Sequence, residues 1–142
     1  MKALVKQFMF SGIFIYSTVS IAEESCRYFE KSIDSSMSYS YTPSSLQPCA
    51  ERGSIPAQLA LAKHYLSTGE NTGEAENWYH HAANNGNAEA QYQLGVMYLE
   101  GISVMENADK ALEWISIAAS QRHPEAVKVY EYILYNDGPL EC

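Results

Sequence analysis

Apolar residues in the middle of the chain recur at helical spacing, and the whole arrangement occurs twice. In the segment 75–83 they fall at i, i+3, i+4, i+7 and i+8, a single stripe along a helix made of Ala75, Trp78, Tyr79, Ala82 and Ala83. The same stripe returns 36 residues later, at 111–119, and an earlier block at 57–66 returns 33 residues later. Two blocks that repeat in the same order predict a tandem repeat of paired helices.

The boundaries of this pattern predict an all-α fold of short antiparallel helices. Pro56 and Pro124 stand where helices can begin, since a missing N–H is harmless in the first turn. Gly69, Gly86 and Gly101 follow the expected helix ends, where a left-handed residue closes the last turn. We expect a half-unit near 43–52, helix pairs at 56–67/74–85 and 88–99/108–121, and a capping helix at 124–135.

The recurring residues resemble the Sel1-like repeat, a relative of the tetratricopeptide repeat. The first copy departs from the family pattern, because Ala62 replaces a glycine, Glu74 replaces a lysine and the loop between the helices is shorter. The second copy matches at Ala90, Leu94, Gly95, Tyr98, Gly101, Lys110, Ala111, Trp114, Ala118 and Ala119.

This resemblance covers about residues 43–138. It implies a right-handed α-solenoid of antiparallel helix pairs, with about two full repeats and terminal half-repeats. The residues that the family shares build the solenoid and form no site. What the resemblance implies about function is therefore protein–protein adaptation, often in bacterial envelopes, signalling or effector-related systems.

The first 22 residues have the pattern of a secretory signal peptide. Lys2 and Lys6 precede an apolar run at 8–19, and Ser20 and Ala22 are small residues at the −3 and −1 positions of a cleavage site. The alternative is a retained membrane anchor, but a run of about 12 apolar residues is shorter than the roughly 20 that span a bilayer. We expect a periplasmic or secreted protein that has no stable membrane insertion after cleavage.

Three cysteines remain after such cleavage, and an oxidising compartment permits them to form disulfides. We expect a Cys26–Cys49 bond that tethers the segment 23–42, with a chain-entropy gain on the order of 3 kcal/mol. Cys142 is the last residue of a short tail at 139–142. It could join two chains into a dimer or replace one partner in this assignment.

Composition and motifs argue against several classes of function. Acidic residues outnumber basic ones 17 to 9, so the chain should repel nucleic acid and anionic lipid. The adjacent His80 and His81 diverge on a helix, and the sequence contains no metal-ligand spacing, phosphate loop or nucleophile motif. We expect no metal, no cofactor and no catalysis. An enzyme acting on cell-wall material is the least favoured alternative.

A second stripe on the first helices is the candidate binding surface. First helices line the concave surface in tetratricopeptide-like stacking, and tyrosine and apolar anchors dominate binding energy. The alternative is that first helices are broadly apolar because they pack against both neighbours. The segment 28–47 could also contact a partner, and its role stays open. The expected binding strip comprises Leu59, Lys63, Leu66, Tyr92, Val96, Leu99, Lys128, Tyr132 and Tyr135.

The functional hypothesis is non-catalytic protein binding in the periplasm, with two versions. One is an envelope adapter or regulator that holds a peptide or effector domain. The other is an immunity protein that neutralises a toxic secreted effector of the lipase type or another type, a role that small exported Sel1-like proteins are known to take. A net charge of −8 fits capture of a basic partner, and it fits simple solubility equally well.

Overall fold

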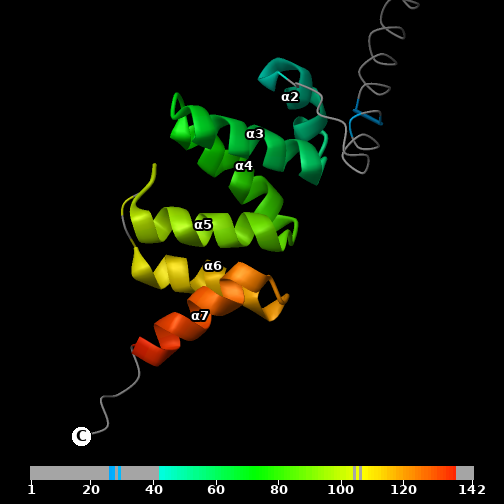
Figure 1. The fold of residues 1–142 in the computed structure, drawn as a ribbon. Helices are drawn as coiled ribbons and strands as arrows, with labels where there is room; N and C mark the ends of the chain where they lie inside the picture. Colours follow the sequence, from blue (N-terminus) through cyan, green and yellow to red (C-terminus); the bar gives the residue numbers. More distant parts are fainter. Residues whose placement is uncertain (1–25, 28, 30–41, 104, 106, 137–142) are drawn as a thin grey trace, which may run out of the picture.

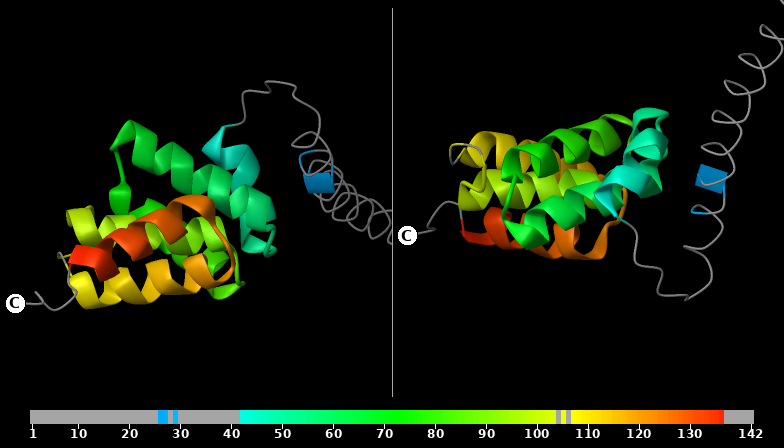
Figure 2. Two further views of the ribbon diagram at one scale, coloured as in Figure 1. Left: turned by 60° about the horizontal axis from the view of Figure 1, so that its bottom comes forward. Right: turned by 90° about the horizontal axis from the view of Figure 1, so that it is seen from above.

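The computed structural model describes residues 26–27, 29, 42–103, 105 and 107–136. Within the helical domain that these residues form, six helices follow one another and no strand occurs. Each helix packs chiefly against the helix before it and the helix after it, as in a solenoid. Figures 1 and 2 show α2 at one end of the stack and α7 at the other. The helices are α2 (Pro43–Glu51), α3 (Ile55–Thr68), α4 (Thr72–Asn84), α5 (Ala88–Glu100), α6 (Ala108–Ser120) and α7 (Pro124–Asn136).

The expected helix boundaries are confirmed to within one or two residues, and local signals explain them. The side chains of Asn71, Asn87 and Asn107 each accept a hydrogen bond from the backbone N–H three residues later, at the start of α4, α5 and α6. Gly69 and Gly101 close α3 and α5 in the left-handed conformation, with φ of 67° and 65°. The left-handed glycines therefore end α3 and α5 where the sequence predicts, and the asparagine caps fix the starts of α4, α5 and α6.

The two helices of the second repeat lie unusually close together at Gly95. A Cβ atom added there would lie 3.2 Å from the backbone oxygen of Ala111 and would collide with the side chain of Ile115, both on α6. The first repeat has Ala62 at the corresponding position, fully buried against the central core cluster. Close helix contact is thus specified by a small residue in each repeat, and the second repeat has no room even for a methyl group.

The predicted disulfide between Cys26 and Cys49 is confirmed. The two Cα atoms lie 5.4 Å apart, and Cys49 is buried with Phe29 and Leu46 at the α2 end of the core. The bond therefore attaches the N-terminal segment to the solenoid. The signal peptide at 1–22, most of the segment 23–42, and the tail at 139–142 with Cys142 lie outside the described residues.

None of the helices in the described part of the chain has the length and hydropathy that crossing a membrane requires.

Candidate functional site

Part of the predicted binding strip packs into the core. Leu59 and Leu66 on α3 are half-buried against the central core cluster. Tyr92 on α5 packs against the cluster between α6 and α7, and its ring stacks on His123 with centroids 4.9 Å apart. These three side chains contribute to packing between neighbouring helices, as the alternative interpretation of the stripe proposed.

The other part of the strip is open to solvent, mostly on α7. Tyr132 is 70% exposed and Tyr135 is 87% exposed, while Leu99 on α5 is 37% exposed. Lys63 and Lys128 are exposed as well, and Val96 is half-buried. Exposed tyrosines that stabilise no core are the part of the strip best suited to contact a partner.

A charged cluster centred on Glu89 joins side chains of α3, α5 and the turn before α7, next to the strip. Its Oε1 lies 3.2 Å from Nζ of Lys63, and its Oε2 lies 3.0 Å from Nε2 of His123. The side-chain amide of Gln93 also donates to Oε1, at 3.3 Å. Lys63 comes from the first repeat, Glu89 and Gln93 from the second, and His123 from the turn before α7. Every oxygen of this carboxylate therefore has a partner.

His123 has a second role as the cap of α7. Its Nδ1 accepts a hydrogen bond from the N–H of Ala126, at 3.3 Å, so in the neutral ring Nε2 carries the proton and donates it to Glu89. Asn87, 36 residues earlier, caps α5 in the same way with its side-chain oxygen. His123 thus keeps the capping contact and adds a link to the neighbouring repeat.

The cluster keeps Glu89 ionised. Partial burial by itself would raise the pKa of the Glu89 carboxyl, but the hydrogen bond from His123 and the charge of Lys63 outweigh that effect, and the pKa lies below its usual value. Burial, and secondarily the charge of Glu89, raise the pKa of Tyr79 to about 12. A carboxylate that is saturated with donors and held ionised acts as a structural bridge and not as a general acid.

Sequence reasoning missed this cluster, although it named Lys63 as part of the strip. The one available signal was His123 itself, which stands directly before Pro124 at the position where Asn87 caps the preceding repeat unit. In the described part of the chain, no group of three or more His, Cys, Asp or Glu side chains could hold a metal ion.

Comparison with known proteins identifies the repeats. The family model described as "Sel1 repeat" matches residues 55–87, which hold α3 and α4, and residues 88–123, which hold α5 and α6. The chain thus contains two Sel1 repeats and is a Sel1-repeat protein. Sel1-repeat proteins generally mediate protein–protein interactions and are typically non-catalytic scaffolds.

Solved structures of similar sequence share the fold. A Sel1 repeat protein from Oxalobacter formigenes is 29% identical with a TM-score of 0.62, over 68% of this chain and 40% of that one. A protective antigen of uropathogenic Escherichia coli with an SLR fold is 28% identical with a TM-score of 0.61, over 68% of this chain and 21% of that one.

Two curated proteins show the same pattern of partial similarity. Chitin synthase regulatory factor 3 of Schizosaccharomyces pombe is 39% identical over 58% of this chain, and an uncharacterized protein of Neisseria meningitidis is 34% identical over 59% of it. The matches span only 9% and 18% of those proteins. The similarity therefore covers only a small part of either relative.

Proposed function

We propose that the chain is a non-catalytic protein-binding module, exported to the periplasm, that acts as an envelope adapter or regulator. The observation that carries the proposal is the exposure of Tyr132 and Tyr135 on α7. Two large side chains that lie three residues apart on one helix face, without a role in the core, are suited to anchor a partner segment. Lys128 adds a basic group on the same face.

An immunity protein for a toxic secreted effector is the second candidate. A net charge of −8 supports it, because a strongly acidic protein captures a basic partner faster than a neutral one does. The genomic neighbourhood distinguishes the two versions. A toxin gene beside this one favours the immunity role, whereas envelope-biogenesis genes favour the adapter.

Site-specific photocrosslinking in the native host tests the binding surface. A photoreactive phenylalanine replaces Tyr132 in one variant and the exposed Asn77 on α4 in the control. We expect a discrete crosslinked protein from position 132 that is absent from position 77. Equal crosslinking from both positions, or none from position 132, would contradict a site on α7.

Truncation then measures the energetic role of the strip against the partner so identified. We expect Tyr132→Ala to weaken binding by about tenfold or more, since anchor residues contribute about 2 kcal/mol, with little change in thermal stability. Leu94→Ala, at a fully buried position, should instead cost roughly 2–5 kcal/mol of folding stability. Tyr92→Ala should affect both properties, because Tyr92 also packs against His123.

Mass spectrometry of protein recovered from separated cell fractions tests the export proposal. We expect the chain in the periplasmic fraction, with Glu23 as its first residue. Recovery from the cytoplasm with Met1 retained would contradict export. The same spectrum, taken without reductant, reports whether Cys142 joins two chains.

A further inference from the structure

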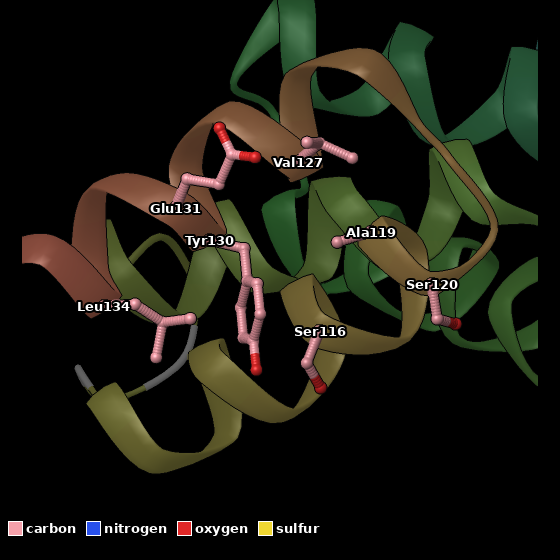
Figure 3. A pocket seen from close by; sticks show the side chains of 7 residues that line it. All are labelled: Ser116, Ala119, Ser120, Val127, Tyr130, Glu131 and Leu134. Atoms are coloured by element: carbon pink, nitrogen blue, oxygen red, sulfur yellow. The ribbon is translucent and has the colours of Figure 1, made fainter.

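An open groove lies at the end of the helical stack, between α6 and α7. Its volume is about 400 Å³. Val127, Tyr130, Glu131 and Leu134 line it from α7, and Ser116 and its neighbours line it from α6. Figure 3 shows the Tyr130 ring projecting from α7 toward α6. Leu134 is 52% exposed, so this end of the stack leaves an apolar side chain uncovered.

The residues that line the groove correspond, position by position, to residues of a surface that another helix covers inside the stack. Moving back by one repeat of 36 residues takes its lining from α6 and α7 to α4 and α5. Inside the stack, the surface formed by α4 and α5 is where α6 lies. The equivalent pairs are Ser116 with His80, Glu131 with Gly95, and Leu134 with Tyr98.

Each of these three interior positions contacts α6. Gly95 lies against Ile115, and a Cβ at this position would collide with that side chain. Nζ of Lys110 lies 5.2 Å from the centre of the Tyr98 ring. The ring of His80 lies against an aromatic ring of α6, with centroids 5.8 Å apart. The groove between α6 and α7 therefore corresponds to the surface of α4 and α5 that α6 covers inside the stack. No described helix covers the groove.

The chemistry of this surface differs from that of the interior one most strongly at Glu131. Glu131 stands where Gly95 stands, so a carboxylate replaces bare backbone at the place that Ile115 contacts inside the stack. A helix with an apolar residue at that place would cover the charge of Glu131 without pairing it, which is unfavourable. A helix with a lysine or arginine there would form an ion pair, and the net charge of −8 favours the approach of a basic segment.

We propose that the groove binds an amphipathic helix of a partner protein that carries a basic residue opposite Glu131. The helix would lie on α6 and α7 as α6 lies on α4 and α5, with apolar residues over Tyr130 and Leu134. This surface is separate from the binding strip, and the proposal does not depend on the partner that the strip binds.

Two synthetic peptides test the proposal by charge exchange. Both have the sequence of residues 107–121, which comprises α6 and its two capping residues. They differ only in carrying Ile115→Lys or Ile115→Glu. Each is labelled with a fluorophore and titrated by anisotropy with the full chain and with its Glu131→Lys variant. We expect the lysine peptide to bind the native chain about tenfold tighter than the glutamate peptide, and the preference to reverse for Glu131→Lys.

Two further variants locate the binding. Leu134→Ala should weaken the lysine peptide several-fold, while Tyr132→Ala on the opposite face of α7 should leave its affinity unchanged. Absence of binding at about 1 mM peptide, or equal affinity for both peptides, would overturn the proposal. So would a loss of affinity in Tyr132→Ala alone, which would place the peptide on the strip.

Two other occupants of the groove would also overturn the proposal. Sedimentation velocity would detect a second copy of the chain as a concentration-dependent dimer that Leu134→Ala abolishes. A chain ending at Asn136 that binds the lysine peptide about tenfold tighter than the full chain would show that residues 137–142 compete for the groove.

Discussion

Gln58 and Gln91, one repeat apart, make the same buried hydrogen bond. Each side-chain amide donates to the backbone carbonyl eight residues earlier, that of Ala50 at 3.0 Å and that of Ala83 at 3.1 Å. Their side-chain oxygens differ. The oxygen of Gln91 accepts a hydrogen bond from Gln121 at 2.6 Å, whereas that of Gln58 has no partner among the described residues.

This difference predicts unequal costs for the same substitution. Gln91→Met removes two hydrogen bonds and leaves the Ala83 carbonyl with only the hydrogen bond from the Gly86 N–H, so we expect it to lower the free energy of unfolding by about 1–3 kcal/mol. Gln58→Met removes one hydrogen bond and also an unpaired buried oxygen, and we expect a cost smaller by about 1 kcal/mol. Urea denaturation of both variants gives the comparison, and equal costs would contradict it.

The absence of space at Gly95 predicts a strong effect of one added methyl group. We expect Gly95→Ala to destabilise the fold by about 1–3 kcal/mol, because the new Cβ would collide with Ile115 and crowd the Ala111 oxygen. Thermal unfolding followed by circular dichroism measures the change.

Gly73 in α4 is the matched control. A Cβ there has only Asn71 Oδ1 within reach, at 3.6 Å, an ordinary contact. Gly73→Ala should therefore stabilise the helix by roughly 0.5–1 kcal/mol through its higher helix propensity. A destabilised Gly73→Ala, or a neutral Gly95→Ala, would show that steric crowding does not distinguish the two sites.

The cluster around Glu89 predicts an acid-dependent contribution to stability. Because the folded-state pKa of Glu89 lies below its usual 4.5, the ionised carboxylate stabilises the fold above that pH. The contribution is lost as the pH falls through the folded-state pKa. We expect Glu89→Gln to be less stable than the native chain at pH 7, by about 1 kcal/mol or less. The difference should shrink as the pH falls below 4.5, as measured by urea denaturation across the range.

A second variant separates the two roles of His123. We expect His123→Asn to preserve the cap of α7, as Asn87 caps α5, while removing the donor to Glu89. The pKa of Glu89, followed by NMR of the carboxyl carbon, should then rise toward its usual value. An unchanged pKa would show that His123 contributes nothing to the ionisation of Glu89.

Helix positions could be predicted because prolines and left-handed glycines act within a few residues, and the repeat supplies each signal more than once. The disulfide could be predicted because the sequence holds only three cysteines. The Glu89 cluster could not be predicted in this way. Lys63, Glu89 and His123 lie 26 and 34 residues apart, so only the stacking of the helices brings them together.

The binding strip was ambiguous for a related reason. Helical spacing places Tyr92 and Tyr132 on the same face of α5 and α7, yet one stacks on His123 and the other is 70% exposed. The spacing of residues along one helix defines a face but does not say whether the next helix covers it. Tyr92 has α7 beside it, whereas α7 is the last helix that the structure describes.

Arg122 has a left-handed backbone conformation that glycine adopts in the two equivalent turns, after α2 and after α4. Its φ is 64°, and the equivalent residues Gly53 and Gly86 have φ of 91° and 84°. The turn itself imposes this geometry. The N–H of each of these residues donates to the carbonyl three residues earlier, at 2.8, 3.0 and 2.9 Å.

We therefore expect Arg122→Gly to stabilise the protein. A left-handed conformation costs a residue with a Cβ about 1–2 kcal/mol, and the greater freedom of glycine in the unfolded chain offsets part of that gain. The net increase in the free energy of unfolding should be about 0.5–1 kcal/mol. The reverse change, Gly86→Arg, should destabilise by a similar amount, because it places a Cβ in the same kind of turn. Urea denaturation of both variants measures the effect, and a destabilised Arg122→Gly would show that the arginine side chain contributes more to folding than its backbone strain costs.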